Sequence, residues 1–365
     1  MPTDIHFLQH ALRIGKRNLG RTWPNPSVGC VLVKDGQVVT TAITAETGRP
    51  HAETQALEIA GEHARGATAF VSLEPCAHHG QTPPCAQALI DAGIVRVVVA
   101  AHDHDPRVAG KGIVMLRAAG IEVIETFLPE AAAQHAGFFR RITHGMPRVI
   151  MKLATSEDGQ MADVSGRERW ITGERARMHG HTLRNRVDAV LTGIGTVLAD
   201  DPLMNVRLPG VRHDRLVRVV ADRHLRLPLE SQLVRTAKKQ ATWVITSTDA
   251  VEQAASHATD LRECGVKLIA LEDPLLRPRA ILEALGKEGI TRLLVEAGPA
   301  LSTAFLEERL VDRLYWYRAP VLLGNTGQSA ITALHSQLAQ HAASTTIRIG
   351  DDRCDIIELP TCLPV

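Results

Sequence analysis

The sequence predicts an α/β protein of two domains, each built on a sheet that helices cover on both faces. The chain has 365 residues, the length of about two ordinary domains. Short runs rich in Val, Ile and Leu alternate with helical segments, an order typical of such sheets. The segment THGMP at 143–147 interrupts this order. We therefore expect a first domain over residues 1–146 and a second over 147–365.

The first domain is expected to begin with an amphipathic helix over 4–19. Its expected buried stripe is Ile5, Leu8, Ala11, Leu12 and Leu19. Two apolar runs on either side of a KDG turn at 34–36 predict a β-hairpin. Further helices are expected at 51–64, 83–93, 110–120 and 129–146, and further strands at 67–73, 94–101 and 121–125.

The second domain is expected to repeat the strand–helix alternation. Its predicted strands are 148–153, 189–192, 218–221, 242–246, 266–270, 293–296 and 313–317. The span 203–235 is rich in Arg and Pro, so we expect it to form connecting loops.

Composition excludes several classes of protein. The formal charge of +1 gives no basic bias, and aromatic residues make up only 3% of the chain, so nucleic-acid binding is not predicted. The sequence contains no apolar run of about 18 residues, and its first residues lack the apolar core of a signal peptide. Six cysteines in a chain of this length do not suggest a disulfide framework. We expect a cytoplasmic protein without membrane spans.

The strongest chemical motif lies between His51 and Cys85. One imidazole and two thiols, from His51, Cys76 and Cys85, can bind a single zinc ion and leave one coordination position for water. Glu53 follows the first of these ligands by two residues and is not needed as a fourth. Zinc deaminases of amino-heterocycles use this arrangement, in which the metal activates water and the glutamate transfers protons.

Two other readings of this motif stay open. The site could hold a purely structural zinc ion, or no zinc. The general deaminase signature continues as PCxxC, whereas eight residues, AHHGQTPP, separate Cys76 from Cys85 here. We expect the two histidines of this insert, His78 and His79, to be substrate contacts or surface residues rather than a fourth ligand.

The second domain carries weaker signals of its own. It lacks the GxGxxG fingerprint of dinucleotide-binding proteins after its first strand. The segments GIGTVLADDP and VEAGPAL each place glycine ahead of a helix, which suits a bound phosphate. From the residues alone, a plain strand–helix turn is the favoured interpretation, and nucleotide binding is the alternative.

A resemblance to a known protein family adds to the interpretation of both domains. The segments PNPSVG, HAE, EPCxHHGxTPPC and VAGKG closely resemble the deaminase half of the bifunctional deaminase–reductases of riboflavin biosynthesis, the RibD/RibG family. The segments MKLATSEDGQMA, SGRERWIT, LRNRVDAVLTGIGTVLADDP, LMNVR and LLVEAGPAL resemble the reductase half in the same order. The resemblance covers nearly the whole chain. It implies a cytidine-deaminase-like α/β/α sandwich followed by a dihydrofolate-reductase-like α/β domain.

The resemblance also implies a second set of site residues. By this resemblance, NADPH contacts are expected at Ala154, Trp170, Thr196, Asp200 and the turn from Gly298. Substrate contacts are expected at Arg184, Met204, Arg207 and Glu296. Arginine suits the phosphate of a sugar-phosphate substrate because its guanidinium can bind phosphate through two hydrogen bonds.

Five positions depart from the usual pattern of this family. Thr44 stands where histidine is common, and Gln81 stands where lysine or arginine usually meets the substrate phosphate. His104 lies in DHDP, which replaces the usual DPNP. Glu168 and Arg223 each stand where serine is common. None of the five is a predicted zinc ligand.

The resemblance implies a definite function. A zinc-dependent deamination of a diaminopyrimidinone ribosyl phosphate is followed by NADPH reduction of the ribosyl group to ribityl, in a cytoplasmic homo-oligomer. Two alternatives are a pyrimidine deaminase with a degenerate reductase domain and a nucleic-acid base deaminase. The near-neutral charge and the long cysteine spacing disfavour the second alternative.

Overall fold

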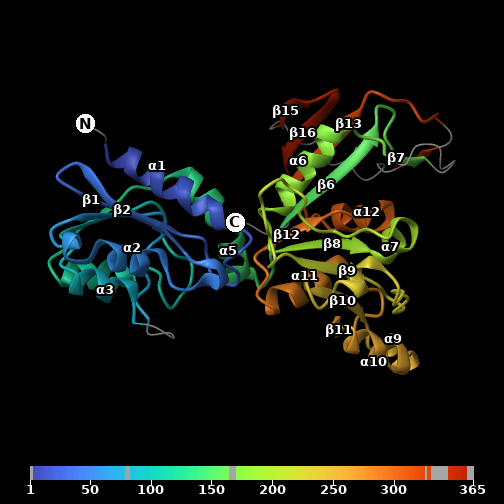
Figure 1. The fold of residues 1–365 in the computed structure, drawn as a ribbon, viewed down its shortest axis with the longest axis horizontal. Helices are drawn as coiled ribbons and strands as arrows, with labels where there is room; N and C mark the ends of the chain where they lie inside the picture. The colour runs from blue at the N-terminus through green and yellow to red at the C-terminus, as the bar shows by residue number, and fades with distance from the viewer. Residues whose placement is uncertain (1–2, 79–82, 164–169, 325–326, 330–343, 360–365) are drawn as a thin grey trace. The chain divides into compact units, whose positions relative to one another are not determined.

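The structure is a computed structural model that describes residues 3–78, 83–163, 170–324, 327–329 and 344–359. The chain divides into two compact units, Met1–Gly145 and Met146–Pro364. They are drawn from blue to red along the chain in Figure 1. Each unit is described by itself.

The first unit is built on a five-stranded mixed sheet with the order β2-β1-β3-β4-β5. Its strands are β1 (Gly29–Lys34), β2 (Gln37–Ile43), β3 (Thr68–Val71), β4 (Arg96–Val99) and β5 (Glu122–Glu125). β1 pairs antiparallel with β2, which confirms the predicted hairpin, and antiparallel with β3. β3, β4 and β5 run parallel.

Helices cover both faces of this sheet. They are α1 (Asp4–Gly15), α2 (Ala52–Ala60), α3 (Cys85–Asp91), α4 (Lys111–Ala118) and α5 (Pro129–His144). α1 packs on β1 and β3 and touches α5, whereas α2, α3 and α4 contact one another in sequence order. Figure 1 shows α1 and the α2–α3 pair on opposite sides of the sheet, which gives the predicted α/β/α sandwich.

The first helix is shorter than predicted. It ends at Gly15, whose carbonyl accepts a hydrogen bond from the Ser27 hydroxyl at 2.6 Å, and a 3-10 turn follows over Lys16–Asn18. Leu8, Ala11 and Leu12 are buried as expected. The prediction was wrong for Ile5, which is 46% exposed because it lies in the first turn of the helix.

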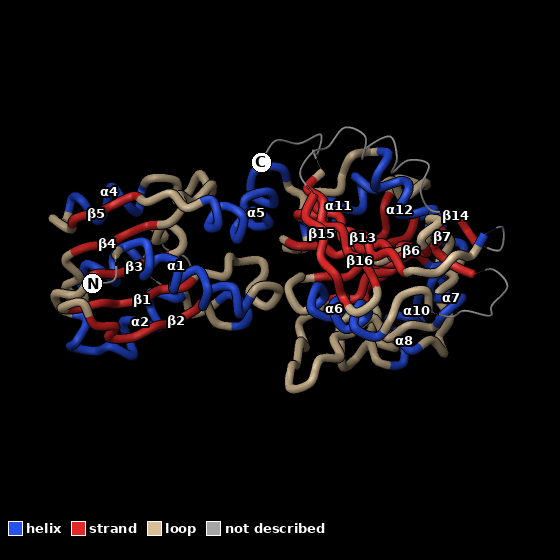
Figure 2. Tube along the Cα trace, turned by 90° about the horizontal axis from the view of Figure 1, so that it is seen from above, coloured by secondary structure: helices blue, strands red, loops and turns tan. Residues whose placement is uncertain are grey.

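The second unit contains a nine-stranded sheet with the order β11-β10-β9-β8-β12-β6-β13-β16-β15. Its strands are β6 (Arg148–Ser156), β8 (Ala189–Gly193), β9 (Val217–Ala221), β10 (Thr242–Ser247), β11 (Lys267–Leu271), β12 (Arg292–Val295), β13 (Arg313–Ala319), β15 (Ser344–Ile349) and β16 (Asp352–Glu358). A separate pair joins β7 (Gln160–Asp163) to β14 (Gly327–Ser329). Figure 2 shows β6, β13 and β16 side by side.

The strands from β11 to β13 are all parallel, so their carboxyl ends open at one edge of the sheet. These are the seven strands that the sequence predicts. β16 and β15 complete the sheet in antiparallel orientation. β15 was not predicted because most of its residues are exposed and it lacks an apolar run.

The helices of the second unit are α6 (Glu174–Arg184), α7 (Ile194–Asp200), α8 (Gln232–Arg235), α9 (Thr248–Gln253), α10 (Ala255–Glu263), α11 (Pro278–Lys287) and α12 (Pro299–Glu307). No helix in the described part of the chain is long and apolar enough to cross a membrane.

The Arg- and Pro-rich span 203–235 is more ordered than a set of connecting loops. It contains β9 and α8, and Arg218 on β9 is only 1% exposed. The Arg218 guanidinium donates to the carbonyls of Leu233 and Gln240 at 3.2 and 2.7 Å. This arginine therefore ties α8 and the chain before β10 to the sheet, a use of arginine that composition cannot distinguish from a solvated loop.

Candidate active sites

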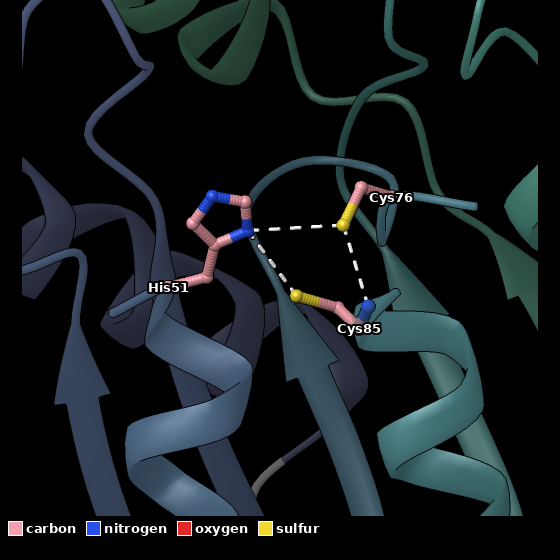
Figure 3. A group of neighbouring side chains, drawn as sticks. All are labelled: His51, Cys76 and Cys85. Atoms are coloured by element: carbon pink, nitrogen blue, oxygen red, sulfur yellow. Dashed lines mark hydrogen bonds between the residues drawn. The ribbon is translucent and has the colours of Figure 1, made fainter. Parts of the chain in front are cut away.

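The three predicted zinc ligands come together at the ends of three elements of the first unit. His51 is the N-cap residue of α2, and Cys85 is the first residue of α3. Cys76 lies between them in the sequence, on the segment that follows β3. Figure 3 shows the imidazole and the two sulfur atoms turned toward one another.

The geometry of this cluster fits zinc. The Nδ1 atom of His51 lies 3.3 Å from Sγ of Cys85 and 3.8 Å from Sγ of Cys76. Ideal Zn–N and Zn–S bonds in a tetrahedron place nitrogen and sulfur about 3.6 Å apart. Among the described residues this group has three members, with all ligand atoms within 4.8 Å of one another. Three protein ligands leave a coordination position for water, as in catalytic zinc sites.

The protein itself favours a thiolate at this site. Hydrogen bonding from Cys85, through its thiol and its backbone N–H at 3.3 Å, lowers the pKa of the Cys76 thiol to about 4. The hydrogen bond with Cys76 raises the pKa of His51. The hydrogen bond with Cys76 and burial raise the pKa of the Cys85 thiol. The donor set is thus prepared for a cation.

Glu53 lies in the first turn of α2, two residues beyond His51, and is only 3% exposed. Burial raises the pKa of its carboxyl group, and the nearby charge of His51 partly offsets this effect. A carboxylate with a raised pKa beside a metal cluster is a suitable proton acceptor.

The segment carrying Cys76 is fixed by its neighbours. A side chain at Gly112 would place a Cβ atom 2.0 Å from the carbonyl oxygen of Pro75, so only glycine allows α4 to pack here. The buried carboxylate of Glu74 accepts the backbone N–H groups of Asp103 and Gly110 at 3.3 and 3.1 Å. The VAGKG motif therefore supports the metal-binding segment. In the sequence, this motif supported only the family resemblance, and no role was predicted for it.

Two of the positions in this unit that depart from the family pattern, Thr44 and His104, have structural partners. The Thr44 hydroxyl accepts the backbone N–H of Val28 at 3.0 Å and is buried. His104 stacks on the Phe139 ring at 3.9 Å between centroids. Burial raises the pKa of Asp103, in the same segment, to about 7. Gln81 and His79 lie outside the described residues.

In the second unit, the predicted substrate residues Arg184 and Glu296 form a paired ion bridge. Arg184, at the end of α6, donates from Nε and an Nη atom to the two Glu296 oxygens at 2.6 and 2.9 Å. The two side chains are 14% and 10% exposed. Burial alone would raise the pKa of Glu296, but Arg184 lowers it to about 2.

The chain around Met204 and Arg207 packs against this pair. Arg184 donates to the Asn205 carbonyl at 3.0 Å, and Arg207 donates to the Asn205 side chain at 2.7 Å. Nδ1 of His181 lies 3.2 Å from the same carbonyl oxygen. Met204 is buried with a positive φ of 49°. The structure thus brings together the four predicted substrate residues, while Arg207 itself stays exposed.

Sequence reasoning missed Lys152 and His181. Lys152 lies on β6, and its burial lowers its pKa. The charge of Glu296 raises this pKa, and the charge of Arg184 lowers it. Burial and the charges of Arg184 and Arg207 lower the pKa of His181 to about 4. Lys152 could have been noticed in the sequence, because a lysine is unusual within the apolar run of β6. No sequence feature marked His181, because it lies on an otherwise ordinary helix.

Two of the predicted cofactor residues are neighbours at the carboxyl edge of the sheet. Thr196 lies in α7, after β8, and its hydroxyl is 3.7 Å from where a Cβ of Gly298 would be. Gly298 is the N-cap of α12, whose first backbone N–H groups suit a bound phosphate. A Cβ at Gly195 would meet nothing within 4 Å. This open, glycine-lined edge fits a dinucleotide.

The other predicted cofactor residues are more scattered. Ala154 lies on β6 opposite Tyr317 of β13. Trp170 precedes α6 and is 58% exposed, with the Arg177 guanidinium 5.2 Å from its ring. Asp200 is exposed at the last residue of α7. Glu168 lies outside the described residues.

Comparison with known proteins finds relatives for both units. A profile described as the cytidine and deoxycytidylate deaminase zinc-binding region matches residues 1–101, and the RibD C-terminal domain profile matches residues 147–350. The riboflavin biosynthesis protein RibD of Actinobacillus pleuropneumoniae is 41% identical over 338 residues, which cover 91% of this chain and 87% of that protein. The protein of the same name from Escherichia coli K12 is 40% identical over 336 residues, covering 90% and 91%.

Solved structures agree with these sequence relatives. The structure of Acinetobacter baumannii RibD superposes with a TM-score of 0.86 at 38% identity, covering 98% of this chain and 99% of that one. A Thermotoga maritima protein described as a diaminohydroxyphosphoribosylaminopyrimidine deaminase/5-amino-6-(5-phosphoribosylamino)uracil reductase gives a TM-score of 0.83 at 32% identity, with the same coverage. Both similarities extend over the two units.

Proposed function

Because this chain belongs to the RibD family, the bifunctional deaminase–reductases of riboflavin biosynthesis, we propose specific roles for its residues in the two reactions. We assign deamination to residues 1–146 and reduction to residues 147–365. The substrate is a 2,5-diamino-6-(ribosylamino)-pyrimidinone 5′-phosphate, and the final product is 5-amino-6-(5-phosphoribitylamino)uracil. The related Thermotoga protein carries both activities in its name, which supports this substrate class.

In the first reaction, His51, Cys76 and Cys85 hold the zinc ion. When bound there, zinc supplies a Lewis acid that activates water toward the amino-bearing carbon of the pyrimidine. Glu53 accepts the proton of that water and returns it to the departing ammonia. Its burial supports this role, because a raised pKa allows the carboxyl group to accept a proton and release it again.

In the second reaction, bound NADPH would supply the hydride for reduction of the ribosyl group to ribityl. We assign Thr196 and the turn at Gly298 to the cofactor phosphates, with Ala154, Trp170 and Asp200 as further cofactor contacts. Arg184, Arg207, Met204 and Glu296 bind the product of the first reaction. Arg184 keeps Glu296 ionised, and the exposed Arg207 suits the substrate phosphate.

The compartment and assembly of the protein also belong to this proposal. In the described residues, Cys30, Cys76, Cys85, Cys264 and Cys354 are free thiols, which supports a reducing compartment such as the cytoplasm. We propose a homo-oligomer with a small-molecule substrate and no nucleic-acid partner. Sedimentation velocity of the purified chain tests the oligomer, and a monomer at micromolar concentration contradicts it.

One observation carries the proposal: a three-ligand metal cluster with a buried glutamate two residues from its histidine. A coupled assay with the pyrimidine substrate tests it by measuring ammonia release and NADPH oxidation separately. We expect ammonia release without NADPH, and NADPH oxidation only after deamination. Ammonia release without any later NADPH oxidation would support a deaminase with a degenerate reductase domain instead.

A further inference from the structure

A buried tyrosine of the second unit makes polar contacts that have no role in the two proposed reactions. Tyr317 lies on β13 and is 0% exposed. Its hydroxyl oxygen lies 2.6 Å from Nδ1 of His179, which is on α6. The same side chain forms a hydrogen bond with Cys354 on β16. Because partners on two different elements hold the tyrosine, the position of its ring is fixed.

The ring lies on the face of the sheet that carries Lys152. β6 and β13 are parallel neighbours, with Tyr315 opposite Lys152 and Tyr317 opposite Ala154. Alternate residues of a strand share a face, so Lys152 and Tyr317 lie on the same side of the sheet. The Nζ atom of Lys152 lies 5.8 Å from the centroid of the Tyr317 ring. At this distance the face of an aromatic ring attracts a cation.

Helix α6 covers both side chains. A Cβ atom at Gly180 would lie 3.9 Å from Cε of Lys152, so the backbone of the helix packs on the lysine stem. Ala176, one turn earlier on the helix, packs in a buried cluster with Tyr317 and Cys354. The lysine stem and the tyrosine ring are therefore enclosed between one helix and the sheet.

The groups around Lys152 have opposing effects on its charge. Burial lowers the pKa of Lys152, and the charge of Glu296 raises it. Further effects come from Arg184 and Arg177, which lower this pKa, and from Cys354, which raises it. Glu296 also receives two hydrogen bonds from Arg184, so its negative charge is shared between two cations. A neutral aromatic face provides an additional attraction for the ammonium group.

We propose that Tyr317 is a positioning residue of the reductase site, whose ring face holds the Lys152 side chain as an ammonium ion beside Glu296. The inference rests on the reductase assignment of this unit. A charged donor forms stronger hydrogen bonds to substrate oxygen atoms than a neutral amine does. Tyr317 therefore acts on the reaction through Lys152, and His179 and Cys354 hold the ring in place.

Increasingly fluorinated phenylalanines at position 317 of the full chain test this inference. Fluorine withdraws electrons from the ring face and so weakens its attraction for a cation, while the size of the ring changes little. NADPH oxidation with the deaminated substrate is followed between about pH 7 and pH 10. The alkaline limb of kcat/KM should stay in place in Tyr317→Phe. Along the fluorinated series it should move to lower pH by about 0.4 to 1.5 units, the value of a cation–π contact.

Two controls accompany this series. Lys152→Arg keeps a cation that does not lose its proton in this pH range, so the alkaline limb should disappear. The same fluorinated residues at Phe305, a buried ring of α12, should leave the limb in place. Ammonia release should be unchanged in every variant, and circular dichroism verifies that each variant is folded.

The outcomes separate this inference from the reductase assignment. A limb that stays in place along the whole fluorinated series overturns the inference, even if activity falls at every pH, because Tyr317 then has only a structural role. A limb that persists in Lys152→Arg overturns it as well, because the reaction then does not depend on the Lys152 ammonium group. If the unsubstituted chain does not oxidise NADPH with the deaminated substrate, the reductase assignment itself is wrong.

Discussion

Glu53 in the first unit and Glu296 in the second have opposite pKa shifts, although little of either side chain is exposed. Glu53 in the first unit is 3% exposed and its pKa is raised by burial. The Glu296 side chain in the second unit is 10% exposed, yet its pKa is lowered to about 2. The difference is the paired hydrogen bonds that Glu296 receives from Arg184. Burial favours the neutral acid, and a guanidinium partner reverses that preference.

The two sites also differ in how the chain assembles them. His51 and Cys85 are 34 residues apart and lie at the starts of two helices that touch each other. Arg184 and Glu296 are 112 residues apart and meet because β8 and β12 are neighbours in the sheet. The candidate metal cluster is thus a local feature of one chain segment, and the Arg184–Glu296 pair is a product of sheet topology. Substitutions in the second unit should therefore leave the metal cluster intact, and substitutions in the first unit should leave the Arg184–Glu296 pair intact.

The largest expected effect is that of a zinc ligand. Cys85→Ser is expected to lose most of its zinc and to abolish ammonia release, because a catalytic site with two remaining protein ligands holds zinc weakly. Metal analysis of the purified chain and the ammonia assay measure both effects. NADPH oxidation with the deaminated substrate should persist.

Cys264→Ser is the matched control, since Cys264 lies at the end of α10 in the other unit. It should retain one zinc ion per chain. Full zinc occupancy in Cys85→Ser would mean that another residue completes the site.

A smaller effect is expected for the proton-transfer residue. Glu53→Gln should lower the rate of ammonia release about 10²- to 10⁴-fold, the usual contribution of a general acid–base group. The zinc content should stay unchanged, because Glu53 is not among the three cluster residues. Retained turnover would remove the proton-transfer role, and lost zinc would make Glu53 part of the metal site.

In the second unit, Arg207→Ala should raise the KM for the deaminated substrate about 10- to 100-fold. The reason is the loss of a charged hydrogen bond to the substrate phosphate. Because Arg207 is exposed, the substitution is expected to leave the stability of the unit nearly unchanged. Steady-state NADPH oxidation measures the effect, and ammonia release serves as the internal control. Equal losses in both activities would contradict the independence of the two sites.

The smallest expected effect is a dependence of stability on pH. His181 has a folded-state pKa of about 4, against an ordinary value of about 6.5. As pH falls from about 6.5 to 4, the unfolded chain binds the proton first, so the free energy of unfolding decreases by at most about 1 kcal/mol per pH unit.

His181→Gln should remove this part of the dependence while other acid-side effects remain. Urea unfolding at pH 7 and pH 5, followed by tryptophan fluorescence, compares the two chains. An equal loss of stability in both between these pH values would show that His181 does not titrate as the structure indicates.

Glu296 adds a separate dependence at lower pH. Its lowered pKa contributes stability above about 4.3, and this contribution is lost as pH falls toward 2. The two windows meet near pH 4, so most of the His181 effect lies above this pH and most of the Glu296 effect lies below it. Glu53 does not add to this loss of stability at low pH, because its pKa shift has the opposite sign.

Much of this protein was predictable from the order of its residues. The α/β class, the hairpin of β1 and β2 and the seven parallel strands of the second unit follow from apolar runs and turn residues. The failures have physical reasons. Ile5 has the right spacing for the buried stripe but lies in an exposed first turn. The span 203–235 has the composition of connecting loops but also contains α8, which is tied to the sheet through the buried Arg218.

The sequence by itself predicted the cluster of His51, Cys76 and Cys85, because the types of donor atom and their spacing are written directly in the chain. It could not determine the pairing of Arg184 with Glu296, or that the charges of both act on Lys152. Those features depend on which strands are neighbours. Apolar periodicity identifies a strand and its buried faces, but it carries no information about strand order, which packing of the whole unit decides.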